Sequence, residues 1–232
     1  MKIHKISRTP TLLTLCGTLL FLCPTARAGQ ELRMPNIFGD HMVLQRDQPI
    51  RLWGWAGQGQ GITVAFAGQT HTATPGADGR WSVTLNALPV ESSGRILTVK
   101  SATSTLSFED VLIGDVWLCG GQSNMEWRLR STRDADVEIP SANYPGIRFI
   151  RIKPEGTPEP RDNFPAENSD GTWLRCTPET IGDCSGVAYF FGQRLHRLGD
   201  TKADNHHHLQ GAILHHRGHH HRESSILQHQ DR

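Results

Sequence analysis

The sequence lacks a long apolar run and a surplus of charge, and each shortage excludes a class of protein. The apolar run from Leu12 to Leu22 is shorter than the roughly 20 residues that a membrane-spanning helix needs. No later segment is apolar enough to span a membrane. A formal net charge of +1 argues against nucleic acid, or an acidic membrane surface, as the main partner. The composition therefore favours one or two globular domains.

Cysteine is also scarce, and its distribution restricts disulfide bonding. Three of the five cysteines lie beyond residue 28: Cys119, Cys176 and Cys184. An odd count leaves one thiol over in an oxidising compartment. Cys119 lies in a segment expected to be buried, so a bond between Cys176 and Cys184 is the one locally plausible pairing.

The first 28 residues have the pattern of a secretory leader. Basic residues precede the apolar run, and Ala26-Arg27-Ala28 places small residues at the two positions that a signal peptidase reads. We expect a mature protein that begins near Gly29, without a membrane anchor, in the periplasm or secreted.

Residues 29–108 contain short β-type runs separated by turn signals. Glycine, proline and aspartate mark the turns, and this spacing predicts a small antiparallel β-sandwich. Trp53, Trp55 and Trp81 fit either a platform on which sugars stack or a sandwich core, and their alternation along strands favours the core. The predicted strand runs are Met42–Leu44, Ile50–Trp55, Ile62–Phe66, Trp81–Leu85 and Ile96–Val99.

The stretch from Val111 to Trp127 contains the candidate nucleophile. Val116–Cys119 reads as a buried parallel strand that ends at Gly120-Gly121, and Ser123 follows at the start of a predicted helix. Backbone N–H groups at such a junction have no intrahelical partner and can stabilise an oxyanion. A serine here also fits a simple helix cap or turn. The stretch departs from the G-x-S-x-G elbow, because Met125 occupies the last glycine position.

Beyond this stretch the sequence predicts one more strand and one good helix. Ile147–Ile152 is the strand, and a proline-rich loop follows it. Ser185 is a good N-cap, and Gly199 supplies the stop. The residues expected on the buried face of this helix are Val187, Phe190, Phe191, Leu195 and Leu198.

Three segments resemble bacterial members of the sialate O-acetylesterase family, which are SGNH-type carbohydrate esterases. They are GDVWLCGGQSNMEW, IFGDHMVLQRDQPIRLWGWA and SGVAYFFGQRL, and the resemblance ends after Gly199. It implies that Ser123 is the nucleophile, that its own N–H contributes to the oxyanion hole, and that Gln122 and Asn124 flank it in the motif. The resemblance also implies that the substrate is an acetylated sugar, either sialic acid or a sugar of a plant or host glycan. It implies a reaction that needs no metal or cofactor.

The resulting fold prediction is a β-sandwich followed by an incomplete α/β hydrolase domain of SGNH or flavodoxin-like type. The expected boundaries are a leader at 1–28, the sandwich at 29–108, the first part of the esterase domain at 109–199 and an aberrant or disordered tail at 200–232. In a flavodoxin-type order the first parallel strand lies between the second and third.

The tail is rich in histidine and does not resemble the family. Nine of the thirteen histidines lie here. A frameshift, a disordered tail, a metal-binding tract and an expression tag all fit, and the frameshift explains the abrupt change best. Asp204-Asn205-His206-His207 matches the family's Asp-x-x-His spelling, but a histidine run produces such matches by chance, so we assign it no role.

These features predict that the family is an esterase family but that this particular chain is inactive. A serine hydroxyl needs a histidine base to attack at neutral pH. The sequence has no histidine that can be assigned this role within a segment predicted to fold. The alternative is a noncatalytic sugar-binding sandwich or a fragment that does not fold. Without a third strand, Val116–Cys119 keeps one neighbour, so the segment after Phe108 is expected to lack independent stability.

Overall fold

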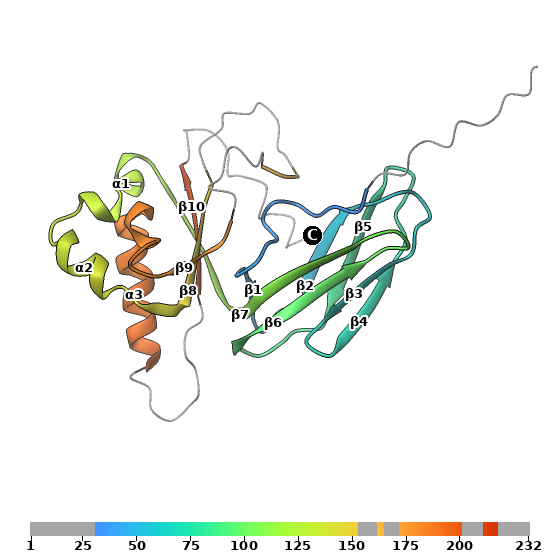
Figure 1. The fold of residues 1–232 in the computed structure, drawn as a ribbon, viewed down its shortest axis with the longest axis horizontal. Helices are drawn as coiled ribbons and strands as arrows, with labels where there is room; N and C mark the ends of the chain where they lie inside the picture. Colours follow the sequence, from blue (N-terminus) through green and yellow to red (C-terminus); the bar gives the residue numbers. More distant parts are fainter. Residues whose placement is uncertain (1–30, 153–161, 165–171, 201–210, 218–232) are drawn as a thin grey trace, which may run out of the picture.

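The computed structural model describes residues 31–152, 162–164, 172–200 and 211–217, which form the two joined halves in Figure 1. The predicted leader at 1–28 lies outside the described residues. The strands of the first half are β1 (Val43–Gln45), β2 (Ile50–Trp55), β3 (Ile62–Phe66), β4 (Gln69–Ala73), β5 (Arg80–Leu85) and β6 (Glu91–Lys100). Then follow β7 (Thr105–Gly121), α1 (Ser123–Glu126), η1 (Leu129–Ser131), α2 (Ala135–Ser141), β8 (Tyr144–Ile152), β9 (Leu174–Cys176), η3 (Ile181–Asp183), α3 (Gly186–Asp200) and β10 (Gly211–Arg217).

The long strand β7 joins the two halves. The described strands form one large curled sheet in the order β4-β3-β6-β7-β10-β8-β9, with β1 parallel to β7, and a separate β2–β5 pair. The first part of β7 runs antiparallel to β6, and its last part, from Asp115 to Gly121, runs parallel to β10. The expected boundary after residue 108 therefore falls inside a single strand.

The first half encloses its core between the β2–β5 pair and the large sheet. Exposed and buried residues alternate along β5, so Trp81, Val83 and Leu85 point inward. They belong to one buried cluster with apolar residues of β2, β3, β6 and β7. The five predicted runs overlap β1, β2, β3, β5 and β6. The sequence QTHTA of β4 carries no large apolar side chain, which is why no strand was predicted there.

The expected tail contains a strand, and this corrects the expectation that no third parallel strand is present. β10 pairs in parallel with β7 on one side and with β8 on the other. Its sequence, GAILHHR, gave little apolar signal, but a strand between two others is held by backbone hydrogen bonds on both edges. The order β7-β10-β8 also differs from the expected order, because β10 rather than β7 lies in the middle.

Helix α3 begins as predicted but buries a different face. Ser185 Oγ accepts a hydrogen bond from the Ala188 N–H at 3.3 Å, which confirms the N-cap, and the helix runs to Asp200, one residue past the expected stop. Four of the five residues expected to be buried, all but Leu195, are exposed. The buried residues are Gly186, Ala188, Tyr189 and Gln193. Figure 1 shows α3 beside β8 and β10, on the side away from the first half.

A polar network explains the burial of that face. The Gln193 side-chain N–H₂ group donates to the Tyr189 hydroxyl at 2.9 Å and to the Tyr144 hydroxyl at 3.1 Å. It also lies 3.3 Å from Glu138 Oε2. Because these partners satisfy the amide, its burial costs little. The apolar pattern of the helix could not reveal partners on α2 and β8.

An ion-pair cluster and a shared core connect the halves. Asp110 of β7 accepts hydrogen bonds from His41 Nδ1 at 2.8 Å and from Arg148 Nη2 at 3.0 Å, and Arg175 pairs with it at 2.8 Å. The Trp173 indole N–H donates to the Ile37 carbonyl at 2.7 Å. Trp173 belongs to the core cluster of the first half.

The three described cysteines are free thiols, so the proposed Cys176–Cys184 disulfide is wrong for this structure. Both side chains are buried in the core of the second half. Burial disfavours the thiolate and raises the pKa of Cys176 to about 12. These cysteines therefore act as small apolar core residues.

Candidate active site

Ser123 lies where a parallel strand turns into a helix, as the sequence predicted, but that strand is not buried as expected, because Trp117 and Leu118 are exposed. β7 ends at Gly121, and Ser123 is the first residue of α1. The Gln122 carbonyl accepts hydrogen bonds from the N–H groups of Met125 at 2.9 Å and Glu126 at 3.3 Å. The N–H groups of Ser123 and Asn124 lie at the start of this helical turn, where a helix provides no backbone acceptor for them.

A close packing contact holds this turn. A Cβ atom on Gly121 would lie 3.1 Å from Met125 Cβ, so the absence of a side chain allows α1 to fold back against the end of β7. The Ser185 hydroxyl lies 3.2 Å from the Met125 sulfur, and the Gly186 N–H donates to the Trp127 carbonyl at 2.8 Å. The start of α3 thus fixes α1 from the other side.

The strands bring their carboxyl ends together beside Ser123. In the parallel pairing, Gly121 is aligned with Arg217 of β10, and Ile152 of β8 is aligned with His216. Ligands of open α/β sheets bind outside the carboxyl ends of the strands. Ser123, Gln122 and Asn124 are all exposed there, so the serine hydroxyl is accessible to a substrate.

The described side chains do not supply a base for Ser123. Its hydroxyl has no hydrogen-bond partner among them. His41 is engaged with Asp110, His71 lies 3.3 Å from the Gln69 amide oxygen, and the His196 ring packs on Tyr144. The Asp204–His207 match lies outside the described residues.

The described residues contain neither a metal-binding cluster nor a membrane-spanning helix. No group of three or more His, Cys, Asp or Glu side chains is arranged to hold a metal ion there. Among the helices of this part of the chain, none is both long and apolar enough to cross a membrane.

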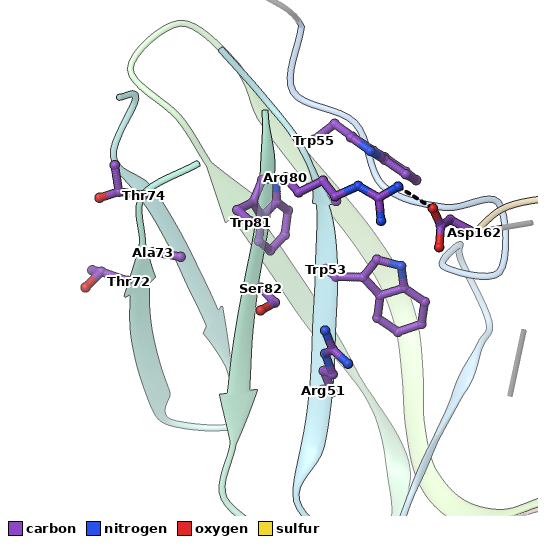
Figure 2. Close-up of a pocket in the computed structure, with 11 residues that line it drawn as sticks. Arg51, Trp53, Trp55, Thr72, Ala73, Thr74, Arg80, Trp81, Ser82 and Asp162 are labelled. Carbon is purple, nitrogen blue, oxygen red and sulfur yellow. Dashed lines mark hydrogen bonds and ion pairs between the residues drawn. The ribbon is translucent and has the colours of Figure 1, made fainter. Parts of the chain in front are cut away.

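A second polar site, which the sequence pattern did not indicate, lies on the β2–β5 pair. A pocket of about 500 Å³ lies there, lined by Trp53, Arg80 and Asp162 among others (Figure 2). Trp81 lies in the core cluster of the first half, in agreement with the core interpretation, whereas Trp55 is buried outside that cluster and Trp53 is partly exposed. The alternation of Arg51, Trp53 and Trp55 along β2 was the one available signal, because residues two apart share a face.

The chain is similar in sequence to esterases of carbohydrate esters. It is 28% identical to sialate O-acetylesterase of Homo sapiens over 193 residues, which cover 76% of this chain and 36% of that protein. It is 28% identical to the Rattus norvegicus enzyme over 195 residues, covering 77% and 36%. The chain thus spans about a third of the length of these relatives. No protein-family model matches the sequence.

A solved structure extends the similarity to the fold. The crystal structure of a carbohydrate acetylesterase from Xanthomonas citri superposes with a TM-score of 0.73 and 31% sequence identity. The match covers 81% of this chain and 40% of that one.

Proposed function

Since the chain belongs to the sialate O-acetylesterase family, we propose that it is a carbohydrate esterase in which Ser123 is the nucleophile. The position of Ser123 supports this most: it is exposed, at a strand-to-helix turn, beside the carboxyl ends of parallel strands. Its substrate is an acetylated sugar, the class that the names of the related enzymes indicate.

The chemistry proposed for this site is acyl transfer. Ser123 Oγ attacks the carbonyl carbon of the acetyl ester, the sugar leaves as an alcohol with the serine proton, and water then hydrolyses the acetyl-serine to acetate. The N–H groups of Ser123 and Asn124, which α1 does not use, would stabilise the negative charge on the carbonyl oxygen. Gln122 and Asn124 shape the turn through their backbones, and no metal is required.

We also propose that the 232-residue chain turns over slowly by itself. A serine hydroxyl attacks efficiently only when a base removes its proton, and none of the histidines with described side chains, His41, His71 and His196, contacts Ser123. The chain should hydrolyse p-nitrophenyl acetate no faster than its Ser123→Ala variant. Added imidazole is an external base and should restore a rate in the parent chain that exceeds the rate in the variant.

Two outcomes and one control variant distinguish the parts of this proposal. Equal rates of both chains in imidazole would show that Ser123 is not the nucleophile. A Ser123-dependent rate without imidazole would support the nucleophile but show that the chain holds its own base. Ser92→Ala, at an exposed serine of β6, is the matched control and should behave like the parent.

We further propose that the protein acts after export. The basic start, the apolar run and Ala26-Arg27-Ala28 support this. Mass spectrometry of protein recovered from the producing cell should show Gly29 as the first residue, and exported protein that retains Met1 would contradict it.

A further inference from the structure

The pocket on the β2–β5 pair has the composition of a binding site for a small polar ligand. Its volume, about 500 Å³, lies in the range of known ligand sites. Residues of β2 and β5 line it, and Thr72 and Thr74 border it from the β4 side. In Figure 2 the Arg80–Asp162 pair lies close to the rings of Trp53 and Trp55.

The register between β2 and β5 determines which side chains share the face that carries Trp53 and Arg80. Trp55 is aligned with Arg80, and Trp53 is aligned with Ser82, across the antiparallel pair. Aligned residues in adjacent strands project to the same side of a sheet. Gly54 between the two tryptophans faces the core, where a Cβ atom would lie 2.3 Å from the Arg33 carbonyl oxygen. The alternation is therefore fixed, and both indoles must face outward.

The polar groups of the pocket complement an aromatic surface. Arg80 and Asp162 form an ion pair at 2.5 Å, and their side chains remain 55% and 35% exposed, so both have hydrogen-bonding capacity for a ligand. Phe38 holds the partly exposed Trp53 ring in an edge contact at 4.9 Å between ring centroids. Trp81 also lines the pocket, and its buried indole N–H has no partner among the described residues.

These observations identify the ligand by its chemistry. A pyranose ring has an apolar C–H face that stacks on an indole, while its rim carries hydroxyls that bind a guanidinium or a carboxylate. We propose that the pocket lined by Trp53, Arg80 and Asp162 binds a pyranose unit of a glycan. This site is separate from Ser123, which lies in the other half, and its occupancy does not depend on ester hydrolysis.

The test follows the indole N–H signals of the ¹⁵N-labelled chain by NMR during titration with three pyranosides. The probes are the methyl β-glycosides of glucose and xylose and the methyl glycoside of N-acetylneuraminic acid. At least one should shift the Trp53 and Trp55 signals in a saturable way, and Trp53→Ala, followed through the Trp55 signal, should weaken its binding about tenfold or more. Sorbitol, which has hydroxyls but no ring face, should shift nothing.

Matched variants keep the proposal falsifiable. Arg80→Gln should also weaken binding, and its exposed position makes unfolding a poor explanation. Trp127→Ala removes an exposed tryptophan of the other half and should bind like the parent. Ser123→Ala should bind normally, which separates this site from the esterase proposal. Absence of a Trp53 shift with all three pyranosides, or unchanged binding in Trp53→Ala, would overturn the assignment.

Discussion

Asp110 is the residue whose charge matters most for the junction between the halves. Arg148 is buried, and two of its three guanidinium nitrogens have no partner among the described residues, so Asp110 supplies its main compensation. Asp110→Asn keeps the shape and tolerates the left-handed backbone at φ 52°. Removing one partner of a buried pair leaves an uncompensated charge, so we expect a loss of about 3 kcal/mol in urea unfolding.

The same residue predicts how stability depends on pH. Burial alone would raise the pKa of Asp110, but the His41 hydrogen bond and the charges of Arg148 and Arg175 outweigh it and hold the pKa below its usual range. A lowered pKa in the folded state gives stability that is present above the unfolded pKa and lost as pH falls through the folded one. The parent should therefore lose stability below about pH 4.

Two comparisons check the Asp110 account. Asp110→Asn should lose less stability than the parent over this acidic range, because the titrating group is gone. Asp47→Asn breaks an exposed pair with Arg46 and should cost less than about 1 kcal/mol. Equal unfolding free energies for the parent and Asp110→Asn at pH 7 would contradict the account.

At the scale of elements, α3 offers a direct comparison between neighbouring residues. Tyr189 is 1% exposed within the polar network, whereas Phe190 is 38% exposed. Replacing a fully buried aromatic side chain with alanine costs about 3–5 kcal/mol. We expect Tyr189→Ala to approach that loss in thermal or urea unfolding, and Phe190→Ala to cost about 1 kcal/mol or less. A larger loss for Phe190→Ala would restore the face predicted from the apolar pattern.

The predictability of each element depended on where its stabilising contacts lie. The Ser185 cap and the turn at Ser123 are local, so residue types at fixed spacing were enough to place them. The burial of Gln193 depends on Tyr144, and the pairing of β10 depends on β7 and β8. Such long-range partners leave no periodic signal, which is why the wrong helix face was chosen and the strand was missed.

The candidate sites differ in the same way. Ser123 was placed by a contiguous motif, and its turn is closed by nearby backbone groups. The pocket beside Trp53 requires Arg80 from the next strand and Asp162 from a distant loop. Only the register of β2 with β5 brings the tryptophans and the ion pair to one face, and a single sequence does not specify that register.

At the scale of the whole molecule, the continuity of β7 predicts that the halves do not separate at residue 108. Val111, Leu112 and Ile113 are at most 2% exposed, and β1 and β6 flank this part of β7. Their amides should exchange as slowly as those of Val64 and Val99 in the first half. The turn at Gly57–Gly61 should exchange quickly and serves as the internal control.

Limited proteolysis distinguishes two independent domains from two halves that share a core. A first cut between Phe108 and Gly114, releasing a stable first half, is what independent domains would produce. The shared core predicts first cuts elsewhere. Early cleavage within that segment would show that the interactions of Asp110 and Trp173 do not hold the halves together.

The central claim, that Ser123 is the acyl-accepting residue, is tested most directly by mapping acetylation. The chain is incubated with p-nitrophenyl acetate and imidazole, quenched in acid and digested, and the acetyl group is located by tandem mass spectrometry. The account predicts acetyl-Ser123 in excess over exposed Ser92, and no acetylated peptide at this position in Ser123→Ala. Acetylation spread equally over exposed serines, or absent from Ser123 while Ser92 is modified, would contradict it.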